Sequence, residues 1–167
     1  MSKIVTSVAF LACIIGANWA LTRFGVVPVG FGLMAPAGVY FAGLSFGLRD
    51  AVQELGGRAW TVGLIVVGAV LSAFIDPTFA LASGCAFLLA ETADLLVYSP
   101  LRDRQWLVAV VASNIVGSVV DSAVFLSLAG FGVTASSMGG MVWGKALMIL
   151  PALVIVGLVR NRRAVAA

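Results

Sequence analysis

The sequence contains no histidine and only two cysteines among its 167 residues, and only 10% of its residues are charged. Cys13 and Cys85 lie in separate apolar stretches, so the chain lacks the ligand clusters that hold zinc or haem iron. Two isolated cysteines also predict no disulfide. No G-x-x-x-x-G-K-[ST] motif occurs, which excludes a phosphate-binding loop of that type. We therefore expect no catalytic residues, no metal and no cofactor.

What the sequence has in abundance is apolar residues, which make up 62% of the chain. The mean hydropathy is +1.13. A soluble domain carries about 25% charged residues, far more than this chain. Because a single globular core cannot bury so large an apolar fraction, the composition predicts an integral membrane protein surrounded by membrane lipid.

Six apolar segments are each close to the roughly 20 residues that a helix needs to cross the hydrocarbon. Short stretches rich in glycine, proline and charged residues separate them, and such stretches interrupt helices. The predicted spans are 4–21, 33–55, 60–75, 79–98, 106–130 and 138–159. The sequence thus predicts an all-α fold in which residues 1–167 form one domain of six transmembrane helices.

Basic residues fall mainly on one side of these six spans. Arg23 lies in a loop on the opposite side, and Lys145 lies inside the last span. Loops rich in lysine and arginine stay in the cytoplasm, so both termini are predicted to be cytoplasmic. The net charge of +3 then follows from topology and indicates no nucleic-acid partner. The basic residues on the predicted cytoplasmic side are Lys3, Arg49, Arg58, Arg102, Arg104, Arg160, Arg162 and Arg163.

Polar side chains inside the predicted spans are the residues that point to function. In segment 113–126 (SNIVGSVVDSAVFL), Asn114, Ser118 and Asp121 lie at i, i+4 and i+7 and therefore share one helical face. A carboxylate is costly in hydrocarbon, so such residues face a bundle interior or a cavity. We expect this stripe to face the interior of the bundle.

The fourth and sixth spans carry further charges. Phe87, Glu91 and Asp94 repeat the stripe spacing, and Lys145 lies within the last span. Counted from the outer ends, Glu91, Asp121 and Lys145 lie about 8 to 11 residues deep, which is near the bilayer middle at ~1.5 Å per residue. Lys145 is a candidate partner of Asp121 or Glu91 in a structural ion pair. The cluster holds more polar groups than neutralisation requires, however, which favours a polar cavity.

Three stretches of the chain resemble the VUT family of YhhQ-like queuosine precursor transporters. The first, at 14–57, reads IIGANWALTRFGVVPVGFGLMAPAGVYFAGLSFGLRDAVQELGG. It has the family's late asparagine in the first helix, a glycine-rich loop and a helix that ends in an acidic motif. FLLAETADLLVYSPLRDRQWL at 87–107 and SNIVGSVVDSAVFLSL at 113–128 resemble the family's fourth and fifth helices.

The resemblance implies a bundle similar to the S-components, the substrate-binding subunits of energy-coupling-factor vitamin transporters. It also implies import of a 7-deazaguanine base, preQ0 or preQ1, across the inner membrane of a prokaryote. The choice between preQ0, preQ1 and queuine stays open, as does the choice between proton coupling and facilitated diffusion.

Such a ligand suits the polar residues. One carboxylate can accept both N–H donors of a guanine-like edge, and charge-assisted bonds are about twice as strong as neutral ones. The opposite edge needs an amide or amine donor, and the ring plane needs an aromatic wall worth ~0.5–1.5 kcal/mol. One hypothesis is that Glu91→Gln sharply weakens binding. The candidate substrate-binding residues are Asn18, Phe87, Glu91, Asp94, Asn114, Asp121 and Lys145.

A second group of polar residues lies at the end of the predicted second span. Asp50, Gln53 and Glu54 share one helical face beside Arg49. One interpretation is a solvated cytoplasmic cap, with Arg49 paired to Glu54. The other is an inner gate or a pocket floor.

Three alternatives to a self-sufficient transporter remain. A vitamin-binding subunit would need an external ATPase, and a membrane enzyme would need a nucleophile–base pair that the sequence lacks. A structural membrane protein would tolerate loss of Asp121 if Lys145 were removed with it. Paired glycines at 43 and 47 and at 140 and 144 predict close helix contacts and leave a homodimer open.

Overall fold

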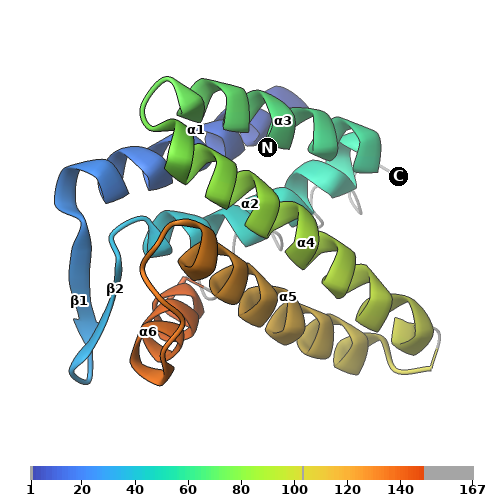
Figure 1. Ribbon diagram of the computed structural model, residues 1–167. Helices are drawn as coiled ribbons and strands as arrows, with labels where there is room; N and C mark the ends of the chain where they lie inside the picture. The colour runs from blue at the N-terminus through green and yellow to red at the C-terminus, as the bar shows by residue number, and fades with distance from the viewer. Residues whose placement is uncertain (1, 103, 149–167) are drawn as a thin grey trace.

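The protein is a bundle of helices with one β-hairpin at its end (Figure 1). The computed structural model describes residues 2–102 and 104–148. Within them, the elements in chain order are α1 (Lys3–Phe24), β1 (Val26–Gly30), β2 (Leu33–Pro36), α2 (Val39–Gly56), α3 (Arg58–Ala73), α4 (Pro77–Arg102), α5 (Trp106–Leu128) and α6 (Ala135–Ala146). The long helices α4 and α5 pack along each other, and α6 packs against the hairpin and α2.

Among the described residues, three helical segments are long and apolar enough to cross a membrane, by length and composition. They are Lys3–Phe24, Pro77–Tyr98 and Val111–Leu128, and α3 is apolar but shorter. The prediction of six spans with both termini in the cytoplasm stays a prediction. The part of the sixth predicted span beyond Met148 lies outside the described residues, as do Arg160, Arg162 and Arg163.

The β-hairpin corrects the all-α prediction and the start of the second span. Helix α2 begins at Val39, not at residue 33, because residues 26–36 form two antiparallel strands. Gly30, Phe31 and Gly32 all have positive φ, at 101°, 55° and 72°. Glycine adopts this conformation without steric cost, so the sequence GFG turns the chain back on itself. A short apolar strand and part of a buried helix look alike in hydropathy.

Local capping residues explain where several helices begin. Asp76 Oδ1 accepts hydrogen bonds from the backbone N–H groups of Thr78 and Phe79, at 2.9 and 3.0 Å, ahead of Pro77 in the first turn of α4. Thr134 caps α6 in a reciprocal arrangement with Ser137. These two signals lie in stretches that the sequence predicts to be helix breaks, and the structure confirms both breaks.

The distribution of polarity is inverted relative to that of a soluble protein. Large apolar side chains such as Ile4, Phe74 and Leu96 are exposed, whereas the charged side chains of Arg49 and Lys145 are buried. Lipid solvates an apolar surface, and charged groups inside a membrane protein face one another. The arrangement therefore fits a membrane protein, in agreement with the composition.

Glycines hold α2 and α6 close together. A Cβ added to Gly43 would lie 2.9 Å from the Cα of Lys145, and one added to Gly144 would lie 2.8 Å from Cγ1 of Val39. Both glycine patterns noted in the sequence therefore serve contacts within this chain. Their close packing places Lys145 at the boundary between α2, α5 and α6.

Candidate functional site

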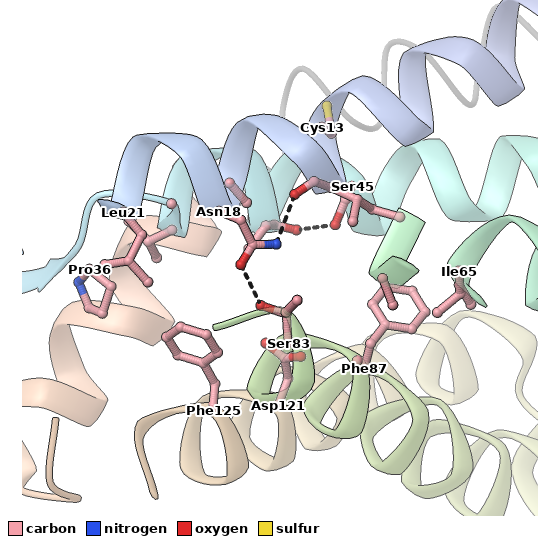
Figure 2. Close-up of a pocket in the computed structure, with 18 of the residues that line it drawn as sticks. Cys13, Asn18, Leu21, Pro36, Ser45, Ile65, Ser83, Phe87, Asp121 and Phe125 are labelled. Atoms are coloured by element: carbon pink, nitrogen blue, oxygen red, sulfur yellow. Dashed lines mark hydrogen bonds between the residues drawn. The ribbon is translucent and has the colours of Figure 1, made fainter. Parts of the chain in front are cut away.

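A cavity of about 80 Å³ has a wall formed mainly by α1, α2, α4 and α5, with smaller contributions from β2, α3 and α6 (Figure 2). Most side chains around it are apolar, which is usual for a small-molecule site with a few oriented polar groups. The described polar side chains in its wall are Asn18, Ser45, Ser83 and Asp121.

Asn18 of α1 is a polar side chain on the upper wall of the cavity in Figure 2. It is only 2% exposed. Its Nδ2 donates to the Ile14 carbonyl at 3.2 Å, and its Oδ1 accepts from the Ser83 hydroxyl at 3.4 Å. An asparagine amide has two donor hydrogens and two acceptor lone pairs. The contacts with described residues thus use half of its capacity, and the rest is available to a ligand.

An aromatic pair forms another part of the wall. Phe46 of α2 stacks on Phe87 of α4, and Phe10 meets Phe87 edge to face at 6.2 Å between ring centroids. Sequence reasoning selected Phe87 but missed Phe46. The available signal was its position one turn before Arg49, which puts both side chains on one face of α2.

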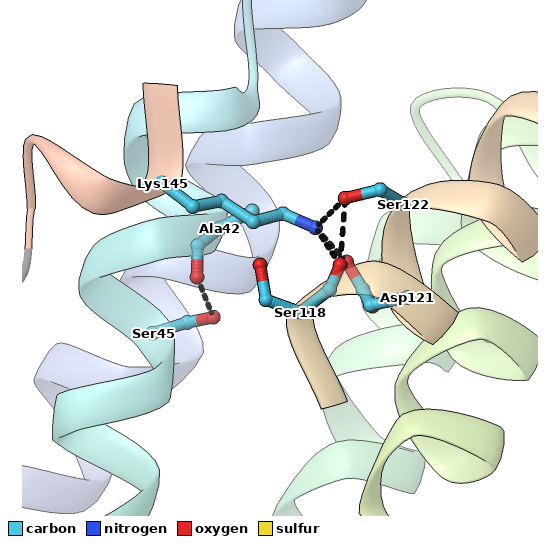
Figure 3. A network of polar contacts seen from close by, with 6 residues as sticks. All are labelled: Ala42, Ser45, Ser118, Asp121, Ser122 and Lys145. Atoms are coloured by element: carbon cyan, nitrogen blue, oxygen red, sulfur yellow. Dashed lines mark hydrogen bonds and ion pairs between the residues drawn. The ribbon is translucent and has the colours of Figure 1, made fainter. Parts of the chain in front are cut away.

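Asp121 lines the cavity and forms a buried ion pair with Lys145 (Figure 3). The Lys145 Nζ donates to Asp121 Oδ2 at 2.5 Å, to the Ser122 hydroxyl at 2.7 Å and to the Ser118 carbonyl at 3.4 Å. Lys145 is 4% exposed and Asp121 8%. A lysine ammonium has three N–H donors, so these three contacts satisfy it completely. The pair joins α5 to α6 beside the cavity.

A second buried ion pair joins α2 to α4. Arg49 contacts Glu91 through Nη1 and Asp50 through Nε and Nη2, the latter two at 2.9 and 2.7 Å. Asp94 also acts electrostatically on Arg49 and packs beside Gly117 of α5. The guanidinium is buried, whereas the Asp50 side chain is 41% exposed. Arg49 is therefore engaged by carboxylates of its own helix and of α4.

The structure separates the predicted site residues into two groups. Asn18, Phe87 and Asp121 line the cavity, and Lys145 lies behind Asp121. Glu91 and Asp94 lie instead in the Arg49 cluster.

The other predicted residues lie away from the cavity wall. Asn114 is half-buried on α5, one helical turn from Gly117. Of the predicted gate residues, Arg49 pairs with Asp50 and Glu91, while Gln53 is half-buried and Glu54 exposed further along α2.

A helical bundle with exposed apolar side chains and a partly polar cavity suits a membrane protein that binds a small molecule. The family model described as "Putative vitamin uptake transporter" matches residues 75–159, just over half of the chain. The chain belongs to this family, which confirms the resemblance noted in the sequence and indicates a role in transport. Searches of curated proteins and of solved structures return no match.

Proposed function

We propose that the protein imports a 7-deazaguanine precursor of queuosine across the inner membrane of a prokaryote. The cavity between α1, α2, α4 and α5 is the proposed binding site. The observation that carries the proposal is the placement of Asn18 and Asp121 on the wall of a cavity that also has a stacked aromatic pair.

The chemistry of the wall matches the ligand. Lys145 donates to Oδ2 of Asp121. Among the described contacts, Oδ1 has no donor, so it can accept hydrogen bonds from ligand N–H groups. A guanine-like edge presents two adjacent N–H donors, and a carboxylate has lone pairs for both. Asn18 can donate to the carbonyl on the other edge. Phe46 and Phe87 supply the flat apolar surface against which a bicyclic ring packs.

The size of the cavity fits such a ligand. Its volume is about 80 Å³. A cavity needs roughly 10–15 Å³, measured in this way, for each water molecule, so this one has room for about six. Six waters occupy about 180 Å³ in the liquid, which is a volume on the scale of a single bicyclic base.

The Arg49 cluster is a proposed gate. Arg49 and Glu91 join α2 to α4, the same two helices that carry the aromatic pair. Separation of α2 from α4 would have to break this ion pair. The cluster therefore suits control of access between the cavity and the side of the membrane where α2 ends.

The proposal is tested by thermal unfolding of the purified protein in detergent with preQ0, preQ1, guanine or biotin in excess. A ligand at 100 times its dissociation constant stabilises the fold by ~2.7 kcal/mol. We expect stabilisation by a deazaguanine and none by biotin. Asn18→Leu should weaken binding about tenfold or more, whereas Thr92→Val, an exposed position on α4, should leave binding unchanged. Equal binding by the Asn18→Leu variant would contradict the assigned role of Asn18.

The family description names vitamin uptake, so a vitamin is a second class of ligand. The second candidate function is therefore a vitamin-binding subunit, which would work with a separate ATPase. Proteoliposomes that contain only this chain distinguish the two. Uptake of labelled preQ0 without another protein supports the proposed transporter, and stabilisation by biotin without such uptake supports the vitamin-binding subunit.

A further inference from the structure

We infer that this cavity selects ligands without a net charge, and that Lys145 sets this selectivity by neutralising Asp121. The inference rests on the proposed function, and it separates the two deazaguanine candidates. The nitrile of preQ0 is uncharged, whereas the aminomethyl group of preQ1 is a cation at neutral pH. The structure therefore favours preQ0.

The charges around the cavity are balanced before any ligand enters. Of the described residues, Asp121 is the charged residue in the cavity wall, and Lys145 binds its carboxylate at 2.5 Å. Lys145 has no donor left for a ligand anion, because Asp121, Ser122 and the Ser118 carbonyl take all three. The remaining described wall is apolar or neutral, with Asn18 as its buried amide.

The Arg49 cluster does not supply a counter-ion to the cavity. Its carboxylates contact or act on Arg49, and Arg49, Asp50, Glu91 and Asp94 are all absent from the described cavity wall. The cluster is thus outside the cavity lining. With Oδ2 of Asp121 bound by Lys145 and Oδ1 taken by the ring N–H groups of the ligand, an ammonium elsewhere in the cavity would have no carboxylate partner in the described wall.

Electrostatics then decides between the ligands. Moving an ion from water into a low-dielectric interior costs several kcal/mol unless a partner compensates it. A neutral nitrile avoids this cost, and the same argument disfavours carboxylate ligands such as biotin. If the Asp121–Lys145 pair served only to join α5 to α6, its removal would change stability but not the relative affinity for charged and neutral ligands.

The experiment measures dissociation constants for preQ0 and preQ1 at pH 7 by titration calorimetry in detergent. For the unmodified protein we expect preQ0 to bind at least about tenfold more tightly, which corresponds to 1.4 kcal/mol. Lys145→Met leaves the Asp121 charge uncompensated, so the preference should fall by about tenfold or reverse. Lys145→Arg keeps the positive charge and should keep the preference for preQ0.

A double variant guards against a folding defect in Lys145→Met. Asp121→Asn combined with Lys145→Met again carries no net charge, so preQ0 should still be preferred, although both affinities fall. Tighter binding of preQ1 than of preQ0 by the unmodified protein would overturn the inference and leave the proposed function intact. An unchanged ratio in a folded Lys145→Met variant would also overturn it. Absence of binding by both ligands would instead overturn the proposed function, and the inference with it.

Discussion

Phe46 of α2 stacks on Phe87 of α4, with 6.0 Å between the ring centroids and 15° between the ring planes. The two rings line the cavity from different helices. The same Phe46 ring lies 5.8 Å from both the Arg49 guanidinium and the Lys145 ammonium. Cations are attracted to aromatic ring faces. This aromatic pair therefore forms part of the cavity wall, and its Phe46 ring is near the cations of both buried ion pairs.

Replacement of Phe46 tests its role in the wall. Phe46→Leu keeps most of the apolar volume but removes the flat ring, so the deazaguanine dissociation constant should rise about twofold to tenfold, as expected from a stacking contribution of ~0.5–1.5 kcal/mol. Titration calorimetry provides the measurement. Phe74→Leu is the matched control because Phe74 is 85% exposed, away from the cavity. Equal effects of the two substitutions would mean that Phe46 contributes only general packing.

Two serines of α5 test the environment of Lys145. Ser122 and Ser127 both donate to the carbonyl four residues earlier at 2.7 Å, but only Ser122 also accepts from Lys145. Ser122→Ala removes an acceptor from a buried ammonium and should lower the free energy of unfolding by ~1–3 kcal/mol. Ser127→Ala, at an exposed position, should change it by less than ~0.5 kcal/mol. Indistinguishable unfolding curves for the two variants would mean that the Ser122–Lys145 contact adds nothing to stability.

Arg49 and Glu91 should be energetically coupled. Arg49→Met leaves the largely buried Glu91 carboxylate without its partner and should cost roughly 3–5 kcal/mol of stability. The double variant Arg49→Met with Glu91→Gln should lose less than the sum of the two single variants, because it removes both charges together. The readout is a double-mutant cycle of unfolding free energies. Strictly additive losses of unfolding free energy would mean that these two side chains are not energetically coupled.

Replacement of Glu91 tests the hypothesis, drawn from the sequence, that this carboxylate binds the ligand. Direct recognition of the ligand by Glu91 predicts that Glu91→Gln abolishes binding, in the single and the double variant alike. An effect that acts through Arg49 predicts that binding returns when Arg49 is also replaced. Ligand titration of both folded variants separates these two outcomes.

Close packing of α2 on α6 predicts opposite effects at two glycines. Gly43→Ala places a methyl group 2.9 Å from Lys145 backbone atoms and from Cβ of Met148, so it should destabilise the protein by ~1–3 kcal/mol. A Cβ at Gly63 of α3 meets no described atom within 4 Å. Gly63→Ala should therefore leave stability unchanged or raise it by up to ~1 kcal/mol, since alanine favours a helix. Thermal unfolding in detergent tests both, and a tolerated Gly43→Ala would show that α2 and α6 can separate without cost.

Several features were predictable because they depend on neighbours in the sequence. Asp76 and Pro77 mark the start of α4, and the spacing of Asn114, Ser118 and Asp121 gives a single polar stripe on α5. The hairpin was harder to predict from the sequence, since Val26–Gly30 is as apolar as a helical segment. Its turn depends on backbone conformations that hydropathy does not reveal.

By itself, the sequence determined that this is a membrane protein with charged residues in its interior. Composition and the spacing of residues along a helix can both be read from the chain without knowledge of its tertiary contacts. Only the tertiary structure decided that Lys145 pairs with Asp121, that Glu91 pairs with Arg49, and that Phe46 lies near both cations. Periodicity shows which side chains share a face of one helix. Which side chain on a neighbouring helix each one meets depends on how the two helices are rotated and shifted against each other. For α2 and α6, the close contact at Gly43 helps to set this arrangement.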